Sequence, residues 1–233
     1  PSRAGAIRVI GDTVLDNVCS GFGDCSPVSQ DSPFTWNRDL TGPWELITNW
    51  EGKGPPDSNS STVVFGSAIT APRTVTLDSD RTVKTITFDS ANRHAISGTG
   101  GLTLAADSGN ASLVVNQGDP EVQVPLTLAS NADFTVTSGS LNLNNQIDLN
   151  GNTLNTSGVV NINHSTVGGG AVVNAGALGT SSSASIGGNL TSTGSLIIHL
   201  GENQTDFFHT SGSANLSGTL DVVLEPGFGP TGL

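Results

Sequence analysis

The sequence predicts an all-β protein, and more specifically a parallel β-helix (β-solenoid) with a loop-rich N-terminal cap. First, only 12% of the 233 residues are charged and strong helix formers are scarce. Second, apolar residues alternate with Thr, Asn, Asp or Ser, which is the period of a half-buried strand. Third, strand-and-turn units recur roughly every 10 residues and pairs of them roughly every 20. An imprecise repeat of that length is typical of stacked coils.

The composition changes near residue 60. Residues 1–60 contain both cysteines, several proline-containing turns and all three tryptophans, Trp36, Trp44 and Trp50. We therefore expect an N-terminal cap over 1–60 and a β-solenoid over 61–233, with the tryptophans covering the open end of the hydrophobic column. The alternative for the tryptophans is an aromatic platform that binds sugars.

Each expected strand is justified by β-branched or alternating apolar residues between turn-forming residues. In the N-terminal part these are 6–10 and 13–15. In the solenoid they are 62–65, 74–77, 82–88, 102–104, 112–115, 122–128, 134–137, 141–143, 146–149, 159–162, 171–173, 196–200 and 219–224. We expect about eight coils, with 168–170 and 181–183 as corners. The alternative, an antiparallel sandwich or jelly roll, needs hairpins between longer strands.

The alternation also predicts which side chains form the core. Those expected to point inward are Val136, Leu143, Leu149, Leu154 and Ile162.

Cys19 and Cys25 flank a short glycine-containing loop that brings their Cβ atoms within disulfide range. We expect a disulfide between them, which favours an oxidising compartment. Two free thiols are the alternative. A metal site would need further ligands, and no neighbouring histidine supplies one.

The charge excludes one class of partner. The net charge is -12, the pI is about 4.3, and no Lys or Arg follows Arg93, so binding to nucleic acid is not expected. No apolar run is long enough for a membrane span. Because the chain contains no methionine, we expect a processed polypeptide that has lost a leader, and secretion is the simplest reason.

Catalytic and metal sites are not indicated. Polysaccharide lyases need basic residues that this solenoid lacks, and glycoside hydrolysis needs two carboxylates close together. The isolated acidic residues are spaced as turn residues: Asp107, Asp119, Asp133, Asp148, Asp206 and Asp221. The histidines lie far apart: His94, His164, His199 and His209. We therefore expect no enzyme, no cofactor and no metal. Asp78-Ser79-Asp80 and Asp89-Ser90 offer oxygen ligands for calcium in neighbouring turns, but solvated acidic turns are favoured over a calcium site.

From Trp36 onward the sequence resembles proteins with autotransporter-associated beta-strand repeats, a family of secreted or surface-exposed bacterial β-solenoids. The motifs that carry the resemblance are Thr35-Trp36, Gly42-Pro43-Trp44, Asn49-Trp50-Glu51-Gly52, Val63-Val64-Phe65-Gly66, and Ser211-Gly212-Ser213 with Gly218-Thr219-Leu220. The resemblance implies an exported structural or surface protein and supplies no catalytic residues.

The predicted function is therefore that of a secreted, extracellular or cell-surface structural scaffold that assembles with itself, head to tail, into a filament or surface layer. We expect the strand-forming segment 6–18 of one copy to add to the C-terminal edge of its neighbour. The alternatives are an adhesin or carbohydrate-binding module, with a glycan as partner, and a polysaccharide-degrading enzyme.

Overall fold

The computed structural model describes residues 32–51, 54–163, 166–202 and 205–229. The chain divides into two compact units, Pro1–Ser32 and Pro33–Leu233. Cys19, Cys25 and the expected strands in 6–18 lie outside the described residues. Within them the second unit consists of β-strands, turns and one 3-10 segment, η1 (Ile47–Asn49), with no α-helix.

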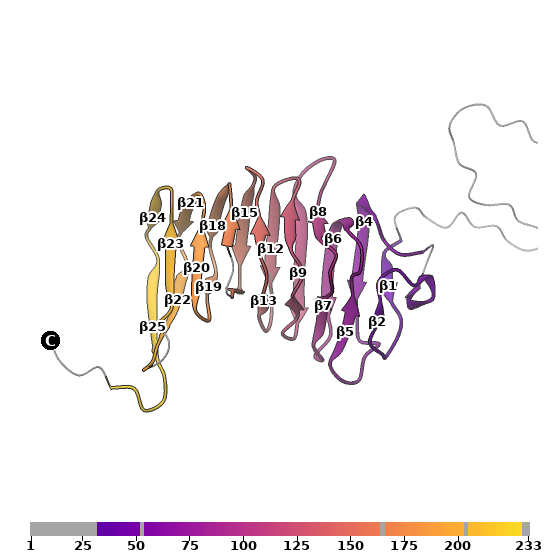
Figure 1. Ribbon diagram of the computed structural model, residues 1–233, viewed down its shortest axis with the longest axis horizontal. Coiled ribbons are helices and arrows are strands. Elements are labelled where there is room, and N and C mark those ends of the chain that lie inside the picture. The colour runs from indigo at the N-terminus through magenta and orange to yellow at the C-terminus, as the bar shows by residue number, and fades with distance from the viewer. Residues whose placement is uncertain (1–31, 52–53, 164–165, 203–204, 230–233) are drawn as a thin grey trace, which may run out of the picture. The chain divides into compact units, whose positions relative to one another are not determined.

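The second unit is a parallel β-solenoid of about eight turns, which confirms the predicted fold class (Figure 1). Its strands form three ladders, here called faces 1, 2 and 3. Face 1 contains β2 (Gly42–Pro43), β5 (Arg73–Thr76), β7 (His94–Ser97), β10 (Glu121–Val122), β13 (Leu141–Leu143), β16 (Val159–Ile162), β19 (Ala177–Gly179), β22 (Ser195–Leu200) and β25 (Thr219–Leu224).

The other two faces belong to a second, 16-stranded sheet. Face 2 contains β8 (Leu102–Leu104), β11 (Leu126–Leu128), β14 (Ile147–Asp148), β17 (Thr166–Gly168), β20 (Ser183–Ile186) and β23 (Phe207–Thr210). Face 3 contains β9 (Ala111–Gln117), β12 (Ala132–Val136), β15 (Thr153–Ser157), β18 (Ala171–Asn174), β21 (Asn189–Ser192) and β24 (Ala214–Leu216).

Faces 2 and 3 meet in the long strand β6 (Arg81–Asp89). Its residues 81–83 pair with β8, whereas residues 85–89 pair with β9. Before it, β4 (Ser58–Phe65) pairs with β6 and also with β1 (Phe34–Trp36), and β1 pairs with β3 (Trp50–Glu51). Regular pairing therefore begins at Phe34, ahead of the expected solenoid start at residue 61, because residues 34–51 already form a first turn.

From β7 onward each complete turn contains three strands, whereas the sequence pattern grouped two strand-and-turn units into one repeat. The expected strand 122–128 shows why, since it divides into β10 and β11 around a turn that contains Pro125. Proline cannot donate a ladder hydrogen bond, so the strand is interrupted there. The corners expected at 168–170 and 181–183 are confirmed at 169–170 and 181–182, while Gly168 ends β17 and Ser183 begins β20.

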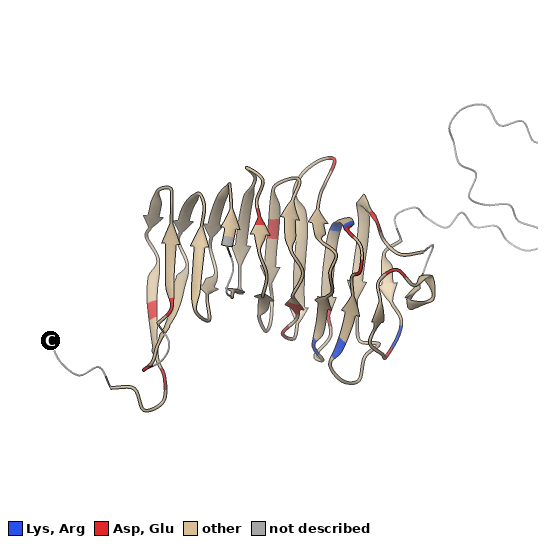
Figure 2. Ribbon diagram, viewed as in Figure 1, with Lys and Arg blue, Asp and Glu red and all other residues tan. Residues whose placement is uncertain are grey.

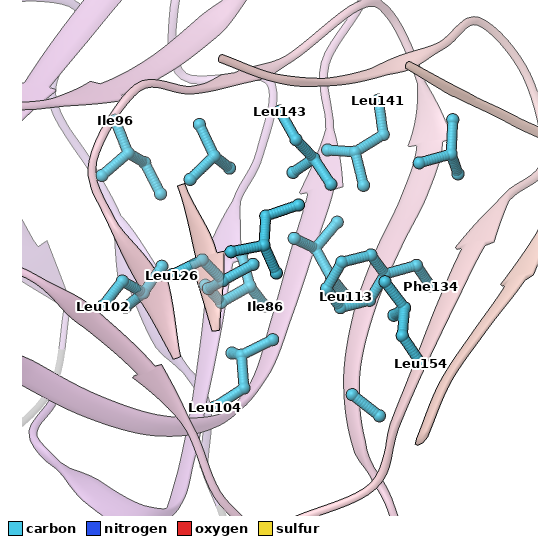
Figure 3. Packing of buried hydrophobic residues seen from close by; sticks show 14 of the residues in the cluster. Ile86, Ile96, Leu102, Leu104, Leu113, Leu126, Phe134, Leu141, Leu143 and Leu154 are labelled. Carbon is cyan, nitrogen blue, oxygen red and sulfur yellow. The ribbon is translucent and has the colours of Figure 1, made fainter. Parts of the chain in front are cut away.

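The core is a continuous column inside the three faces. On face 2, for example, Leu102, Leu126 and Ile147 are in register on successive turns and all are buried. Figure 3 shows Leu102 and Leu126 among the packed side chains of this core. The five side chains expected to point inward are all buried, which confirms that part of the register.

The column is not apolar throughout. On face 3, Thr156, Asn174 and Ser192 are buried in successive turns. The Thr156 hydroxyl donates to Asn174 Oδ1 at 3.0 Å, and Asn174 Nδ2 donates to Ser192 Oγ at 3.0 Å. Because each polar group has a partner, these side chains are tolerated in the interior.

Glycines mark two kinds of corner. Between faces 3 and 1 there is one in each of six turns: Gly118, Gly139, Gly158, Gly176, Gly194 and Gly218. A Cβ at any of them would overlap a backbone oxygen of the preceding turn, so the chain passes too closely there for a side chain. Between faces 2 and 3 both situations occur: a Cβ at Gly109, Gly151 or Gly169 would meet open space, whereas one at Gly170, Gly188 or Gly212 would overlap the backbone of the preceding turn. We call the six positions between faces 3 and 1 the closed corners, and Gly109, Gly151 and Gly169 the open corners.

Candidate interaction surface

Three tryptophans fill the N-terminal end of the column. Trp36 and Trp44 are fully buried and Trp50 nearly so. Their rings meet edge to face, with centroids 5.2 Å apart for Trp36 and Trp50 and 4.8 Å apart for Trp44 and Trp50. Each indole nitrogen donates to a backbone carbonyl oxygen, so the rings are buried without an unpaired N–H. Their burial leaves no face free for stacking on a sugar.

Phe65 joins this cluster to the first complete turns. Its ring contacts those of all three tryptophans and stacks on Phe88 with centroids 5.1 Å apart. The His94 ring is buried, and its centroid lies 5.2 Å from that of Phe65. Its Nε2 lies 3.2 Å from the Gly66 carbonyl oxygen. Burial lowers the pKa of His94 below its usual 6.5, although the hydrogen bond to Gly66 opposes the shift.

This geometry predicts a pH dependence of stability. The unfolded chain takes up a proton on His94 below about pH 6.5, whereas the buried ring stays neutral. The free energy of unfolding should therefore fall as the pH decreases from 6.5 towards the lowered pKa. We expect His94→Gln to reduce the loss of melting temperature between about pH 7.5 and pH 5.5. An unchanged pH dependence in the variant would show that His94 does not cause it.

Acidic side chains tie the outer loops of the first turn to the next. Asp39 bonds Thr70 and forms an ion pair with Arg73 at 2.9 Å; these contacts, led by Thr70, lower its pKa. Burial acts to raise the pKa of Glu45, but hydrogen bonds to its carboxylate, including those from Asp78 and Ser79, lower it overall. The N-terminal end is thus closed by aromatic packing and by a hydrogen-bonded rim.

The C-terminal end is built differently. The last strands β23, β24 and β25 each pair with a strand of the preceding turn on one edge, and among the described residues nothing pairs with the other edge. A hollow of about 260 Å³ opens there, lined by Leu190, Leu196, Phe208, Leu216 and Leu220, among others. The inner column of the solenoid is therefore accessible at this end. Figure 1 shows β23, β24 and β25 as the last strands of the stack.

Exposed apolar side chains gather at both ends. Among the described residues, the large ones are Leu40, Leu46 and Ile47 in the first turn, and Phe207, Leu216, Leu220, Val222, Val223 and Leu224 in the last. The intervening described turns expose none. Sequence reasoning did not single these residues out. Val222-Val223-Leu224 does, however, break the alternation of apolar and polar residues that is expected of a strand with one solvent-exposed face.

The two ends also differ in charge. All eight Lys and Arg residues of the chain lie at or before Arg93. In the ribbon of Figure 2 the Lys and Arg positions of the described part lie only towards the N-terminal end of the solenoid, while Asp and Glu positions continue along it. Asp221 on β25 is exposed and has no ion-pair partner among the described residues.

The acidic turn residues named above are mostly engaged in local bonds. Asp119 accepts from Ser140, Asp133 from Asn110 and Asn155, and Asp148 from the backbone of Asn150. Asp107 bonds Asn59 on another turn. Asp107 and Asp119 lie in turns, as their spacing predicted. Asp133 and Asp148 instead lie on β12 and β14, and Asp221 lies on β25.

The structure brings one histidine and one aspartate together. His199 Nδ1 lies 2.8 Å from Asp206 Oδ2, and the His199 backbone N–H donates to the same oxygen. This pair fixes the connection between β22 and β23.

The other histidines lie apart from this pair. His94 is in the aromatic cluster, His209 is exposed on β23, and His164 lies outside the described residues. Within the described ranges no three His, Cys, Asp or Glu side chains are grouped as metal ligands.

In the described part no helix is long and apolar enough to traverse a bilayer. Comparison with family models, curated proteins and solved structures found no match to this chain.

Proposed function

We propose that this protein is a secreted, extracellular structural scaffold whose solenoids join end to end, head to tail, into a filament or surface layer. One observation carries the proposal: among the described residues, large exposed apolar side chains occur only in the first and last turns. A monomer would leave both groups in water. Contact between the ends of two copies buries them together and continues the column.

Charge favours head-to-tail contact over contact between two C-terminal ends. The last turn carries acidic residues and no basic ones, so two such ends repel each other. The N-terminal half holds every basic residue of the chain. Because a head-to-tail contact uses two different surfaces, it repeats without closing and gives a filament.

Export and a surface role rest on the sequence. The resemblance to autotransporter-associated repeat proteins, the two closely spaced cysteines Cys19 and Cys25, and the acidic, hydrated outer faces support an extracellular location. An adhesin with an exposed aromatic groove has less support, because Phe207 in the last turn is the one exposed large aromatic side chain of the described residues.

Electron microscopy and sedimentation of the native protein test the proposal. We expect filaments, and a sedimentation coefficient that rises with concentration. The double variant Leu216→Thr/Leu220→Thr should remain folded by circular dichroism and sediment as a monomer, because both side chains are more than half exposed, at 56% and 60%.

The matched control is Val173→Thr, which makes the same kind of change on the outer side of β18, in the middle of the solenoid. It should assemble like the native protein. A native protein that stays monomeric at high concentration would overturn the proposal.

A further inference from the structure

The three unpaired edges of the last turn are not equivalent as acceptors of another strand. β25 has six residues, whereas β23 has four and β24 three. All six residues of β25 pair in register with β22, from Thr219 on Ser195 to Leu224 on Leu200. Its free edge therefore offers the longest straight row of unpaired N–H and C=O groups at this end of the described solenoid.

The side chains of β25 have a defined arrangement. Leu220 and Val222 are in register with Leu196 and Ile198, and Leu196, Ile198 and Leu220 all line the hollow. Because side chains alternate along a strand, Asp221 lies on the outer side between two inner apolar residues. An incoming strand with the pattern apolar, basic, apolar would match this edge.

That pattern occurs in the N-terminal sequence Ala6-Ile7-Arg8-Val9-Ile10. We propose that β25 accepts this segment of a second copy as an added strand, with Arg8 beside Asp221 and with Ile7 and Val9 over Leu220 and Val222. The inference rests on the proposed head-to-tail assembly and names its contact. Because Arg8 is the central residue, the same match holds for a parallel and for an antiparallel strand.

Two features favour a second copy as the occupant. Pairing Arg8 with Asp221 places opposite charges directly across neighbouring strands, which stabilises the pairing. Two like charges at these positions would destabilise it. Arg8 is also one of few basic residues in a chain that has none after Arg93. If the segment returned to β25 of its own chain, the exposed Leu40, Leu46 and Ile47 of the first turn would stay in water. A neighbouring copy brings its first turn to this end at the same time.

A charge-exchange experiment on the full chain tests the pairing. Arg8→Glu alone and Asp221→Arg alone each place like charges together, and we expect each to weaken association roughly tenfold by sedimentation at low salt. The double variant Arg8→Glu/Asp221→Arg should recover native association. Asp107→Arg makes the same charge change in an exposed corner away from both ends and should associate like the native protein.

Mixing the two single variants identifies the occupant. In the mixture, the glutamate introduced by Arg8→Glu meets the arginine introduced by Asp221→Arg in the other variant, so association between unlike variants should return. Recovery in the double variant without recovery in the mixture would mean that the segment binds its own chain, which overturns the inference. Single variants that associate like the native protein would also overturn it, while leaving end-to-end assembly by another contact. If the native protein does not associate at all, the proposed function itself is overturned.

Discussion

Val136→Asp is expected to lower the free energy of unfolding by about 4 kcal/mol or more. Val136 lies on β12 with 8% of its surface exposed, and it is in register with the buried Val115 of the preceding turn. An aspartate there either buries an unpaired charge or takes up a proton, and both cost stability. Urea denaturation followed by circular dichroism measures the change.

Thr135→Asp is the matched control for this substitution. Thr135 precedes Val136 on the same strand and is exposed, so the same new side chain enters water there. We expect a change below about 1 kcal/mol. If the two variants were equally stable, Val136 would have to face solvent, and the register of face 3 would be wrong.

Phe65→Ala is expected to cost about 3 to 5 kcal/mol, as is usual for removing a buried aromatic ring. Phe65 is fully buried, and its ring contacts all three tryptophans, Phe88 and His94. Its loss leaves a cavity between the N-terminal end of the column and the turns that follow. This variant therefore removes side-chain packing more than it removes backbone hydrogen bonds.

Tryptophan fluorescence can measure the loss of stability in the region where the Phe65 ring is removed. All three lie between residues 36 and 50, so tryptophan fluorescence reports on the first turn while circular dichroism reports on the whole solenoid. Stability in stacked repeats is partly local. In Phe65→Ala the fluorescence transition should move to lower urea than the circular dichroism transition. Phe34→Ala, at a half-buried ring on β1, should shift both less.

The fold class could be predicted because alternation and repeat length are local properties of the sequence. Leu102-Thr103-Leu104 and Leu141-Asn142-Leu143, for example, read directly as strands with one buried row, and both are. What the pattern could not supply was the third strand of each turn. β17 and β19, for example, have three residues with a single large apolar residue each, so no alternation is visible in them.

The buried polar ladder shows a second limit. Judged by polarity alone, Thr156, Asn174 and Ser192 would be expected on the solvent-exposed face of the strand. They point inward because each one's partner is supplied by the neighbouring turn. Such pairing between residues 18 positions apart is a property of the stacking and not of either residue's own segment.

The candidate interaction surface was foreseen only in part. The sequence predicted an unpaired C-terminal edge and a tryptophan-rich end, since both follow from ordering strands along an axis. It did not show which apolar side chains would stay exposed, because Leu220 has the same local sequence pattern as the buried Leu141. Exposure at the last turn comes from the missing next turn, which no short window of sequence contains.

The two kinds of corner determine where this chain can grow longer. At the closed corners, an inserted residue would push adjacent turns apart, because the backbones already touch around Gly176 and Gly194. At the open corners there is room outside Gly109, Gly151 and Gly169, so inserted peptides would extend into solvent along a single edge of the solenoid. Since neighbouring turns are about 4.8 Å apart, such insertions would form a closely spaced row. We therefore expect inserted residues to be tolerated better beside Gly109, Gly151 and Gly169 than beside the glycines of the closed corners.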